Sequence, residues 1–132
     1  MREYRTGEVA DVLGVSVDTV RRWADDGRLA TTRGPGGHRV VAGPDLARFL
    51  AESPPAFELE GITRQSARNR FAGVVVRVER DGLTGIVELR AGAQRVVSLV
   101  TADALDELRI EPGDLAVAAV KATNVVIELP PG

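Results

Sequence analysis

Residues 6–27 read TGEVADVLGVSVDTVRRWADDG, and this stretch predicts two short helices joined by a tight turn. Thr6 is a candidate cap for the first helix, in which Val9, Ala10 and Leu13 recur at helical spacing. Gly14 then provides a typical stop signal. The first half of the pattern therefore predicts a helix of about two turns.

The second predicted helix shows the same order of features, namely a capping residue, an apolar face and a terminating glycine. Ser16 is a candidate cap, Asp18 suits the positive end of a helix, and Val20 lies on the apolar face. Gly27 is the expected terminator. Two helices with the short connection GVS between them are typical of a helix-turn-helix.

The segments that follow extend this arrangement to about residue 50. LATTRGPGGHRVV, residues 29–41, predicts two short strands around a Gly/Pro turn. GPDLARFLAE, residues 43–52, predicts a third helix with Pro44 and Asp45 in its first turn. We expect this helix to bury Leu46, Phe49 and Leu50.

A helix-turn-helix with a basic hairpin beside it is an arrangement suited to double-stranded DNA. Arginine reaches guanine edges or phosphates, and hydroxyl groups reach phosphates or bases. The hairpin tip would act as a wing on neighbouring phosphates or the minor groove. The candidate DNA-binding residues are Ser16, Thr19, Arg21, Arg22, Arg33, His38 and Arg39. On spacing alone, a helical protein with solvated arginines remains the alternative.

Composition narrows the possible classes of protein. With 132 residues the chain forms one domain or two small ones, and its net charge of −2 excludes a uniformly basic nucleic-acid coat. It has no cysteine, so disulfides and thiolate metal sites are excluded, and we expect no bare metal cation. No apolar run approaches a membrane span, and MREYRTGEVADV lacks the apolar centre of a signal peptide, so a cytoplasmic location is expected. One histidine and no catalytic carboxylate pair argue against an enzyme.

The second half changes to period-two patterning with β-branched residues. FAGVVVRVER and TGIVELRA flank Asp81 and Gly82, which is a hairpin signal. QRVVSLVT, LAVAAVKAT and NVVIEL are further predicted strands, and ADALDEL is a short helix. Five short strands and one helical segment in about 65 residues favour a small barrel.

Two pairs of donor side chains in this half suit a small oxyanion of charge −2. Ser66 and Arg68 are two residues apart, as are Lys121 and Thr123, so each pair would share a face if extended. Arg68 and Lys121 together would balance the charge. The alternative is that both pairs are solvated strand ends.

The first half resembles a known class of DNA-binding domain. YRTGEVADVLGVSVDTVRRWADDGRL, GGHRV and DLARFL, within residues 4–50, resemble the winged helix-turn-helix of the MerR-like and excisionase-like families. The resemblance implies that Trp23 packs in the core or on the wing, and that His38 is a wing contact. The long dimerisation helix of full MerR-type activators is absent, which implies dimerisation through another part of the chain.

The second half resembles the molybdenum-binding Mop or TOBE domain over residues 65–128. SARN, the PGD turn and KAT are the most specific matching pieces. The resemblance implies an OB-like barrel that pairs with a second copy and holds molybdate, or tungstate, at subunit interfaces. It implies that Ser66 and Arg68 of one subunit face Thr101, Lys121 and the backbone N–H of Ala122 of another, with Thr123 as a neighbour. Ala104 stands where related regulators often carry a second hydroxyl.

These inferences define an α+β chain with two domains. We expect a winged helix-turn-helix in residues 1–53, a linker in 54–64 and a barrel in 65–132 that forms a homo-oligomer, dimeric or higher. The leading hypothesis is a molybdate-responsive transcriptional regulator. The alternatives are a molybdate storage protein, or a DNA-binding protein that uses a ligand-free barrel only to assemble.

Overall fold

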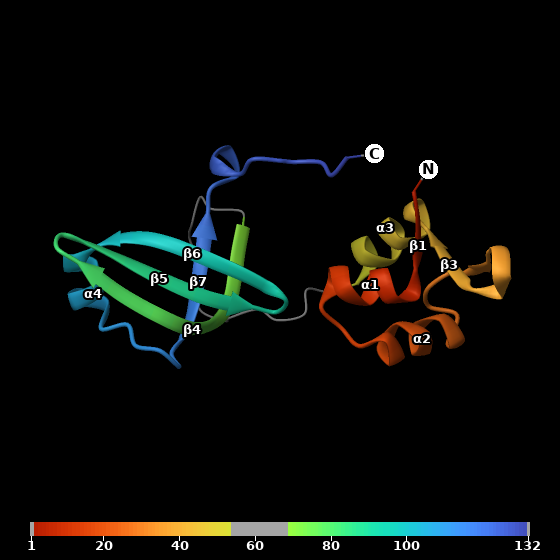
Figure 1. Cartoon of the computed structure of the whole chain (residues 1–132), viewed down its shortest axis with the longest axis horizontal. Helices are drawn as coiled ribbons and strands as arrows, with labels where there is room; N and C mark the ends of the chain where they lie inside the picture. The colour runs from red at the N-terminus through yellow and green to blue at the C-terminus, as the bar shows by residue number, and fades with distance from the viewer. Residues whose placement is uncertain (1, 54–68, 132) are drawn as a thin grey trace. The chain divides into compact units, whose positions relative to one another are not determined.

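The structure is a computed structural model that describes residues 2–53 and 69–131 (Figure 1). The chain divides into two compact units, residues 1–56 and 57–132, and each is considered by itself. The linker predicted at residues 54–64 lies outside the described residues, as do Ser66 and Arg68. The predicted α+β class is confirmed. Among the described residues, no helix has the length and apolar character needed to cross a membrane.

The first unit contains three helices and a small antiparallel sheet. Its elements are β1 (Glu3–Arg5), α1 (Thr6–Leu13), α2 (Val17–Asp25), β2 (Thr32–Arg33), the 3-10 turn η1 (Pro35–Gly37), β3 (Arg39–Ala42) and α3 (Gly43–Glu52). The strand order is β1-β3-β2. The predicted helices and hairpin are present, whereas β1 was not predicted, because three residues are too few to show a period-two pattern.

Local capping explains where α1 and α2 begin and end. The Oγ of Ser16 accepts a hydrogen bond from the backbone N of Thr19 at 3.1 Å, so the predicted cap of α2 is correct. Gly14 ends α1 with a φ of 68°. The predicted cap at Thr6 is wrong, because Thr6 is the first helical residue and Arg5 precedes it. The backbone N of Arg5 instead donates to the carboxylate of Glu8 at 3.2 Å.

The core of the first unit joins all three helices to β3. Its buried residues are Val9, Ala10, Val20, Leu29, Val41 and Leu46. Trp23 packs against this core, and its ring centroid lies 4.9 Å from that of Phe49, as expected for a packing residue. Leu50 is 41% exposed, so the prediction that it is buried is wrong. Phe49 occupies the position against Trp23, and Leu50 lies about 100° further round the helix.

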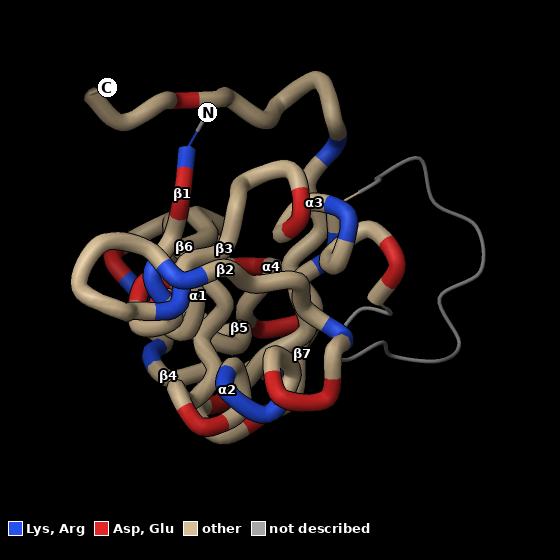
Figure 2. The backbone as a smooth tube through the Cα atoms, turned by 90° about the vertical axis from the view of Figure 1, so that its right-hand side faces the viewer, with Lys and Arg blue, Asp and Glu red and all other residues tan. Residues whose placement is uncertain are grey.

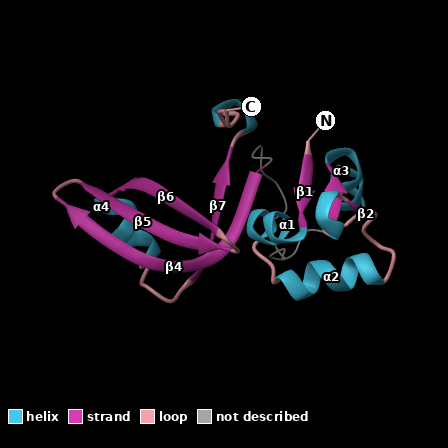
Figure 3. Cartoon of the chain, turned by 45° about the vertical axis from the view of Figure 1, so that its right-hand side comes forward, coloured by secondary structure: helices cyan, strands magenta, loops and turns pink. Residues whose placement is uncertain are grey.

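The second unit is a curled four-stranded sheet with one helix at its end (Figure 3). Its elements are β4 (Asn69–Asp81), β5 (Thr84–Ala91), β6 (Gln94–Thr101), α4 (Ala102–Leu108), β7 (Leu115–Val120) and the 3-10 turn η2 (Ala122–Asn124). The antiparallel order is β6-β5-β4-β7. β4 pairs with β7 through residues 69–74 and with β5 through residues 74–81, so its two halves pair with different strands.

Two glycines allow the sheet to curl and α4 to pack on it. A Cβ added at Gly73 would lie 2.2 Å from the carbonyl oxygen of Arg90, so β4 and β5 approach closely there only without a side chain. A Cβ at Gly85 would lie 2.3 Å from the Cδ1 of Leu105, a buried residue of α4. The pairing of β4 with β5 also shifts register between Val75 and Arg77, which is typical of a β-bulge and bends the strand.

The fifth predicted strand is the main difference between prediction and structure. Residues 124–129 were expected to form a strand, but the 3-10 turn η2 interrupts the chain and residues 125–131 pair with no described strand. Val126, Ile127 and Leu129 are 80%, 79% and 87% exposed. β-branched residues favour a strand only where the edge of another strand is free to pair with them. We call residues 125–129 the apolar tail.

Candidate functional site

The first turn of α2 presents two hydroxyl groups that are bonded to each other. Ser16 Oγ and Thr19 Oγ1 lie 2.9 Å apart, and Ser16 Oγ also accepts from the backbone N of Thr19. Whichever hydroxyl donates within the pair, the other keeps its own hydrogen free for an outside acceptor. The pair can therefore cap the helix and still donate one hydrogen bond to a phosphate or a base.

The arginines of α2 differ in how far they are engaged. Arg21 lies 3.5 Å from the carboxylate of Asp18, and both side chains are exposed. The exposed guanidinium of Arg22 forms no ion pair with any other described residue. Blue and red segments both occur along α2 in Figure 2, so its surface carries both signs of charge. Arg22 is thus the α2 arginine with the fewest internal partners.

The hairpin between β2 and β3, residues 32–42, forms the predicted wing. Its tip is closed by the backbone N of Gly34 donating to the carbonyl oxygen of His38 at 2.8 Å. The guanidinium of Arg33 donates to the carbonyl oxygen of Gly37 at 3.0 Å. Arg39 contacts Asp25, a residue of α2 that sequence reasoning did not assign to any role. His38 is exposed at the tip.

A surface depression of about 710 Å³ is lined by residues of the wing, α1 and α2. Four of the predicted DNA-binding residues meet at this one place. The residues lining the depression are Arg5, Thr6, Gly7, Glu8, Asp11, Arg21, Asp25, Arg33, Gly37, His38 and Arg39. Its lining contains more arginine than carboxylate side chains, which suits an anionic partner.

In the second unit, the candidate oxyanion donors lie at the ends of strands. Thr101 ends β6, and its Oγ1 accepts from the backbone N of Ala104 at 3.1 Å, which caps α4. Its hydroxyl hydrogen is not used in that bond. Lys121, Ala122 and Thr123 follow β7 and are exposed. Ala122 and Thr123 begin η2, where the first backbone N–H groups have no acceptor inside the turn.

The fold places Thr101 and Lys121 at opposite ends of β4. Thr101 pairs with Thr84, which pairs with Asp81 at the end of β4. Val120, the residue before Lys121, pairs with Asn69 at the start of β4. β4 has 13 residues, so about 40 Å of strand separates the two levels. Within one chain, therefore, Thr101 and Lys121 are not brought together.

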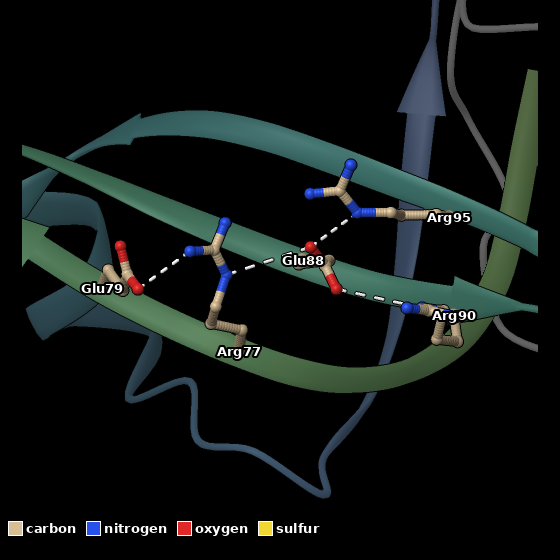
Figure 4. A network of polar contacts seen from close by, with 5 residues as sticks. All are labelled: Arg77, Glu79, Glu88, Arg90 and Arg95. Atoms are coloured by element: carbon tan, nitrogen blue, oxygen red, sulfur yellow. Dashed lines mark hydrogen bonds and ion pairs between the residues drawn. The ribbon is translucent and has the colours of Figure 1, made fainter.

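Sequence reasoning also missed a charged network on the outer face of the sheet (Figure 4). The carboxylate of Glu88, which is buried, lies 2.7 Å from Arg95, 3.8 Å from Arg90 and 3.9 Å from Arg77. The hydrogen bond from Arg95 and the three positive charges lower the pKa of Glu88, against the opposing effect of desolvation. The alternation of acid and base across the predicted hairpin was the available signal, but it needed the strand register.

Comparison with known proteins assigns both units. Residues 3–54 match the helix-turn-helix domain family, and residues 65–127 match the TOBE domain family. Both are families of binding domains rather than enzymes, so the prediction that the chain is not an enzyme is confirmed. The assignment to the MerR-like group within helix-turn-helix proteins stays a prediction.

Individual relatives match the second unit. Molybdenum-pterin-binding protein 3 of Clostridium pasteurianum is 36% identical over 63 residues, which are 47% of this chain and 93% of that protein. The molybdenum transport protein ModE of Herbaspirillum seropedicae is 37% identical over 65 residues, and the match spans 48% of this chain but only 24% of ModE. Among solved structures, the cytoplasmic molybdate-binding protein ModG with molybdate bound is 37% identical, with a TM-score of 0.48, over 52% of this chain and 50% of that one. The TOBE match and the relative that is covered to 93% of its length show that the chain belongs to the TOBE domain family that includes the molybdenum-pterin-binding proteins, and it carries a helix-turn-helix domain ahead of its TOBE domain.

Proposed function

We propose that the protein is a DNA-binding transcriptional regulator that responds to molybdate. The observation that supports this most directly is the presence of a helix-turn-helix domain and a TOBE domain on one chain. The names of its relatives indicate molybdenum as the element that they transport or bind. Because the proposed target is DNA, we expect the protein to be located in the cytoplasm.

The first unit would bind double-stranded DNA through α2 and the wing. An α-helix fits the major groove, and the side chains of its first turns reach base edges. Arg21 and Arg22 on α2 would contact guanine edges or phosphates, and Ser16 and Thr19 would supply the free hydroxyl hydrogen. Arg33 and His38 would bring the wing to neighbouring phosphates.

The second unit would hold the oxyanion between chains. The family resemblance implied that one chain supplies both Thr101 and Lys121, opposite Ser66 and Arg68 of another. We propose instead that Thr101 comes from a different chain than Lys121, Ala122 and Thr123, and that Ser66 and Arg68 complete the site. This arrangement is supported by the separation of Thr101 from Lys121 along β4. Arg68 and Lys121 balance an anion of charge −2, which favours binding in a partly dehydrated interface.

A homo-oligomer is required by this site, and the apolar tail supports one. An unpaired β-branched segment with Val126 and Ile127 exposed is unfavourable in water, and burial against a second copy would remove that cost. β6 pairs only with β5 among the described strands, so its outer edge is a place where a further strand can add. We expect a dimer or a larger assembly through the TOBE unit.

Calorimetric titration with molybdate, tungstate and sulfate tests the ligand. We expect molybdate to bind to the wild-type protein and to lose measurable binding in Lys121→Ala, because one of the two balancing charges is removed. Arg48→Ala, which removes a positive charge from the first unit, is the matched control and should bind molybdate normally. No heat from any of the three anions would support the ligand-free alternative.

Mixing two inactive variants tests whether the site is shared. Thr101→Ala and Lys121→Ala chains should each bind poorly as separate homo-oligomers. After unfolding and refolding together, mixed oligomers should recover a fraction of the sites, because some interfaces then combine the intact Thr101 of one chain with the intact Lys121 of another. If mixing recovers nothing while both variants assemble normally, the shared arrangement is wrong.

Substitution of arginines tests the DNA surface. Arg22→Ala should weaken binding to duplex DNA and reduce the slope of log K against log salt by about 0.9 for each phosphate that the arginine neutralises. Molybdate binding should be unchanged. Normal DNA binding by both Arg21→Ala and Arg22→Ala would contradict the assignment of α2 as the recognition helix.

A further inference from the structure

The contact between Asp25 and Arg39 joins the last residue of α2 to the first residue of β3. Nη2 of Arg39 lies 2.5 Å from Oδ1 of Asp25, and its Nη1 donates to the carbonyl oxygen of Arg21 at 3.5 Å. Both terminal nitrogens of the guanidinium are thus directed at α2. The Arg39 side chain is 28% exposed, compared with 62% for Arg21, so it is the less available of the two to an outside anion.

The base of the wing is fixed, because β1 pairs with residues 40–42 and Val41 is buried in the core, so the part left to be held against α2 is the outer half, residues 32–39. β2 is two residues long, and Gly36 and Gly37 at the tip both have positive φ, a region that glycine enters without steric cost. Arg33 donates to Gly37 within the same hairpin, so that bond holds the tip but not the hairpin as a whole. The pair of Asp25 with Arg39 crosses from the hairpin to α2.

Charge gives a second reason to distinguish Arg39 from the other arginines. Asp25 lines the same depression as Arg21 and Arg33, where an unpaired carboxylate would repel DNA phosphates. Its contact with Arg39 balances that charge. Asp18 differs in this respect, because its contact with Arg21 lies within one helix and is 3.5 Å long.

We propose that Asp25 and Arg39 are a positioning pair that sets the wing against the recognition helix, and that Arg39 is held by Asp25 instead of contacting phosphate. This rests on the proposed DNA-binding function. It refines the role expected for Arg39 from a direct contact to a positioning residue. The wing residues that remain to contact DNA are then Arg33 and His38.

The salt dependence of DNA binding separates a positioning residue from a phosphate contact. The probes are a duplex selected by the wild-type protein from a random pool and a scrambled duplex of the same composition. Arg39→Met combined with Asp25→Asn, which leaves no unpaired carboxylate in the depression, should lower the ratio of selected to scrambled affinity and leave the salt slope unchanged. A residue that neutralises a phosphate would instead lower the slope by about 0.9 and weaken both duplexes alike, and that result would overturn the proposal.

Asp25→Asn gives the opposite signature, because it releases a guanidinium. We expect tighter binding to scrambled DNA, a slope increased by up to about 0.9, and a lower ratio of selected to scrambled affinity. Asp45→Asn is the matched control, since it removes the same charge from a pair with Arg48 inside a single helix. The charge-reversed double variant, Asp25→Arg with Arg39→Asp, should restore the ratio, and failure to restore it in a folded protein would contradict a positioning role.

A measurement on the free protein separates this proposal from the proposed function. In Asp25→Asn, the backbone amides of Gly37 and His38 should show lower NMR order parameters than in the wild type, because the wing is no longer tied to α2 by the ion pair. Unchanged order parameters would overturn the positioning pair even if DNA binds. Failure of the wild-type protein to enrich any duplex from the pool would overturn the DNA-binding function, whatever the wing does.

Discussion

Glu88 shows how a single residue can depend on a whole sheet. Its carboxylate is buried on the outer face, and it is stabilised there by Arg95 on β6, Arg77 on β4 and Arg90 on its own strand. A buried charge without such partners would be costly. The three guanidinium groups therefore lower the pKa of Glu88 below its usual value.

This lowered pKa predicts how acid affects the second unit. The folded state favours the ionised form, so the stabilisation is complete above the ordinary glutamate pKa of about 4.3 and is lost as pH falls through the lower folded value. Asp106, whose pKa is lowered by its hydrogen bond from Arg80, acts in the same direction. Glu88→Gln should therefore be less stable at pH 7 and lose less stability between about pH 5 and pH 3.

Urea unfolding at several pH values, followed by the methyl signals of Val87 and Leu89, measures this effect in the second unit. Glu107→Gln is the control, because it removes an exposed carboxylate of the second unit that forms no ion pair with another described residue. An equal loss of stability on acidification in wild type and Glu88→Gln would show that Glu88 does not respond to its arginine partners in this way.

Residue-level prediction succeeded where the cause was local. Ser16 caps α2 through an atom three residues away, and Gly14 ends α1 through its own φ, so both could be identified from short patterns. The closest partners of Glu88 and Asp25 come from other elements, 7 and 14 residues away in sequence. Their positions depend on strand register and on tertiary packing, which short patterns do not contain.

At the scale of elements, the curl of the sheet depends on Gly73. An alanine Cβ at this position would meet the carbonyl oxygen of Arg90 at 2.2 Å, and a backbone atom cannot move aside as a flexible side chain can. Gly73→Ala should destabilise the second unit by about 3 kcal/mol, at the upper end of the cost of overpacking. Urea unfolding followed by the methyl signals of Val75 and Leu89 measures the change.

Gly7→Ala should change stability in the opposite direction to Gly73→Ala. Gly7 lies inside α1, and nothing approaches within 4 Å of the added Cβ. The substitution should stabilise the first unit by about 0.5 to 1 kcal/mol, because alanine loses less conformational freedom in a helix. Trp23 fluorescence reports this unit. If both glycine variants behaved alike, steric approach at Gly73 would not be the determining factor.

The pattern of elements explains which parts of the fold were predictable. Long periodic segments such as β5 and α2 were identified, because their patterns are carried by eight or nine consecutive residues. β1 was too short, and residues 124–129 had the composition of a strand but no partner among the described strands of the same chain. The candidate oxyanion residues were chosen as a group by family resemblance, and only the strand pairing separates Thr101 from Lys121.

At the scale of the whole molecule, a molybdate-responsive regulator requires that molybdate binding to one unit changes DNA binding by the other. A ligand shifts a conformational equilibrium only when it binds one state better than the other. Suppose that molybdate bound to the TOBE unit favours an assembly in which two helix-turn-helix units fit neighbouring major grooves. Bound DNA must then favour the same assembly, and so it must raise the affinity for molybdate. A storage protein, or one that uses its barrel only to assemble, has no such requirement.

Reciprocity makes this relation measurable. We expect saturating molybdate to change the affinity for the selected duplex by a factor of about 5 to 150, and the duplex to change the affinity for molybdate by the same factor. Fluorescence titrations at constant salt measure the first factor, and calorimetry with and without duplex measures the second, with sulfate at equal ionic strength as the control. Lys121→Ala should remove the coupling while leaving the DNA affinity of the ligand-free state unchanged, because Lys121 lies in the second unit. A factor of one in both directions, with each ligand still binding, would mean that the two units act independently and that the protein is not a molybdate-responsive regulator.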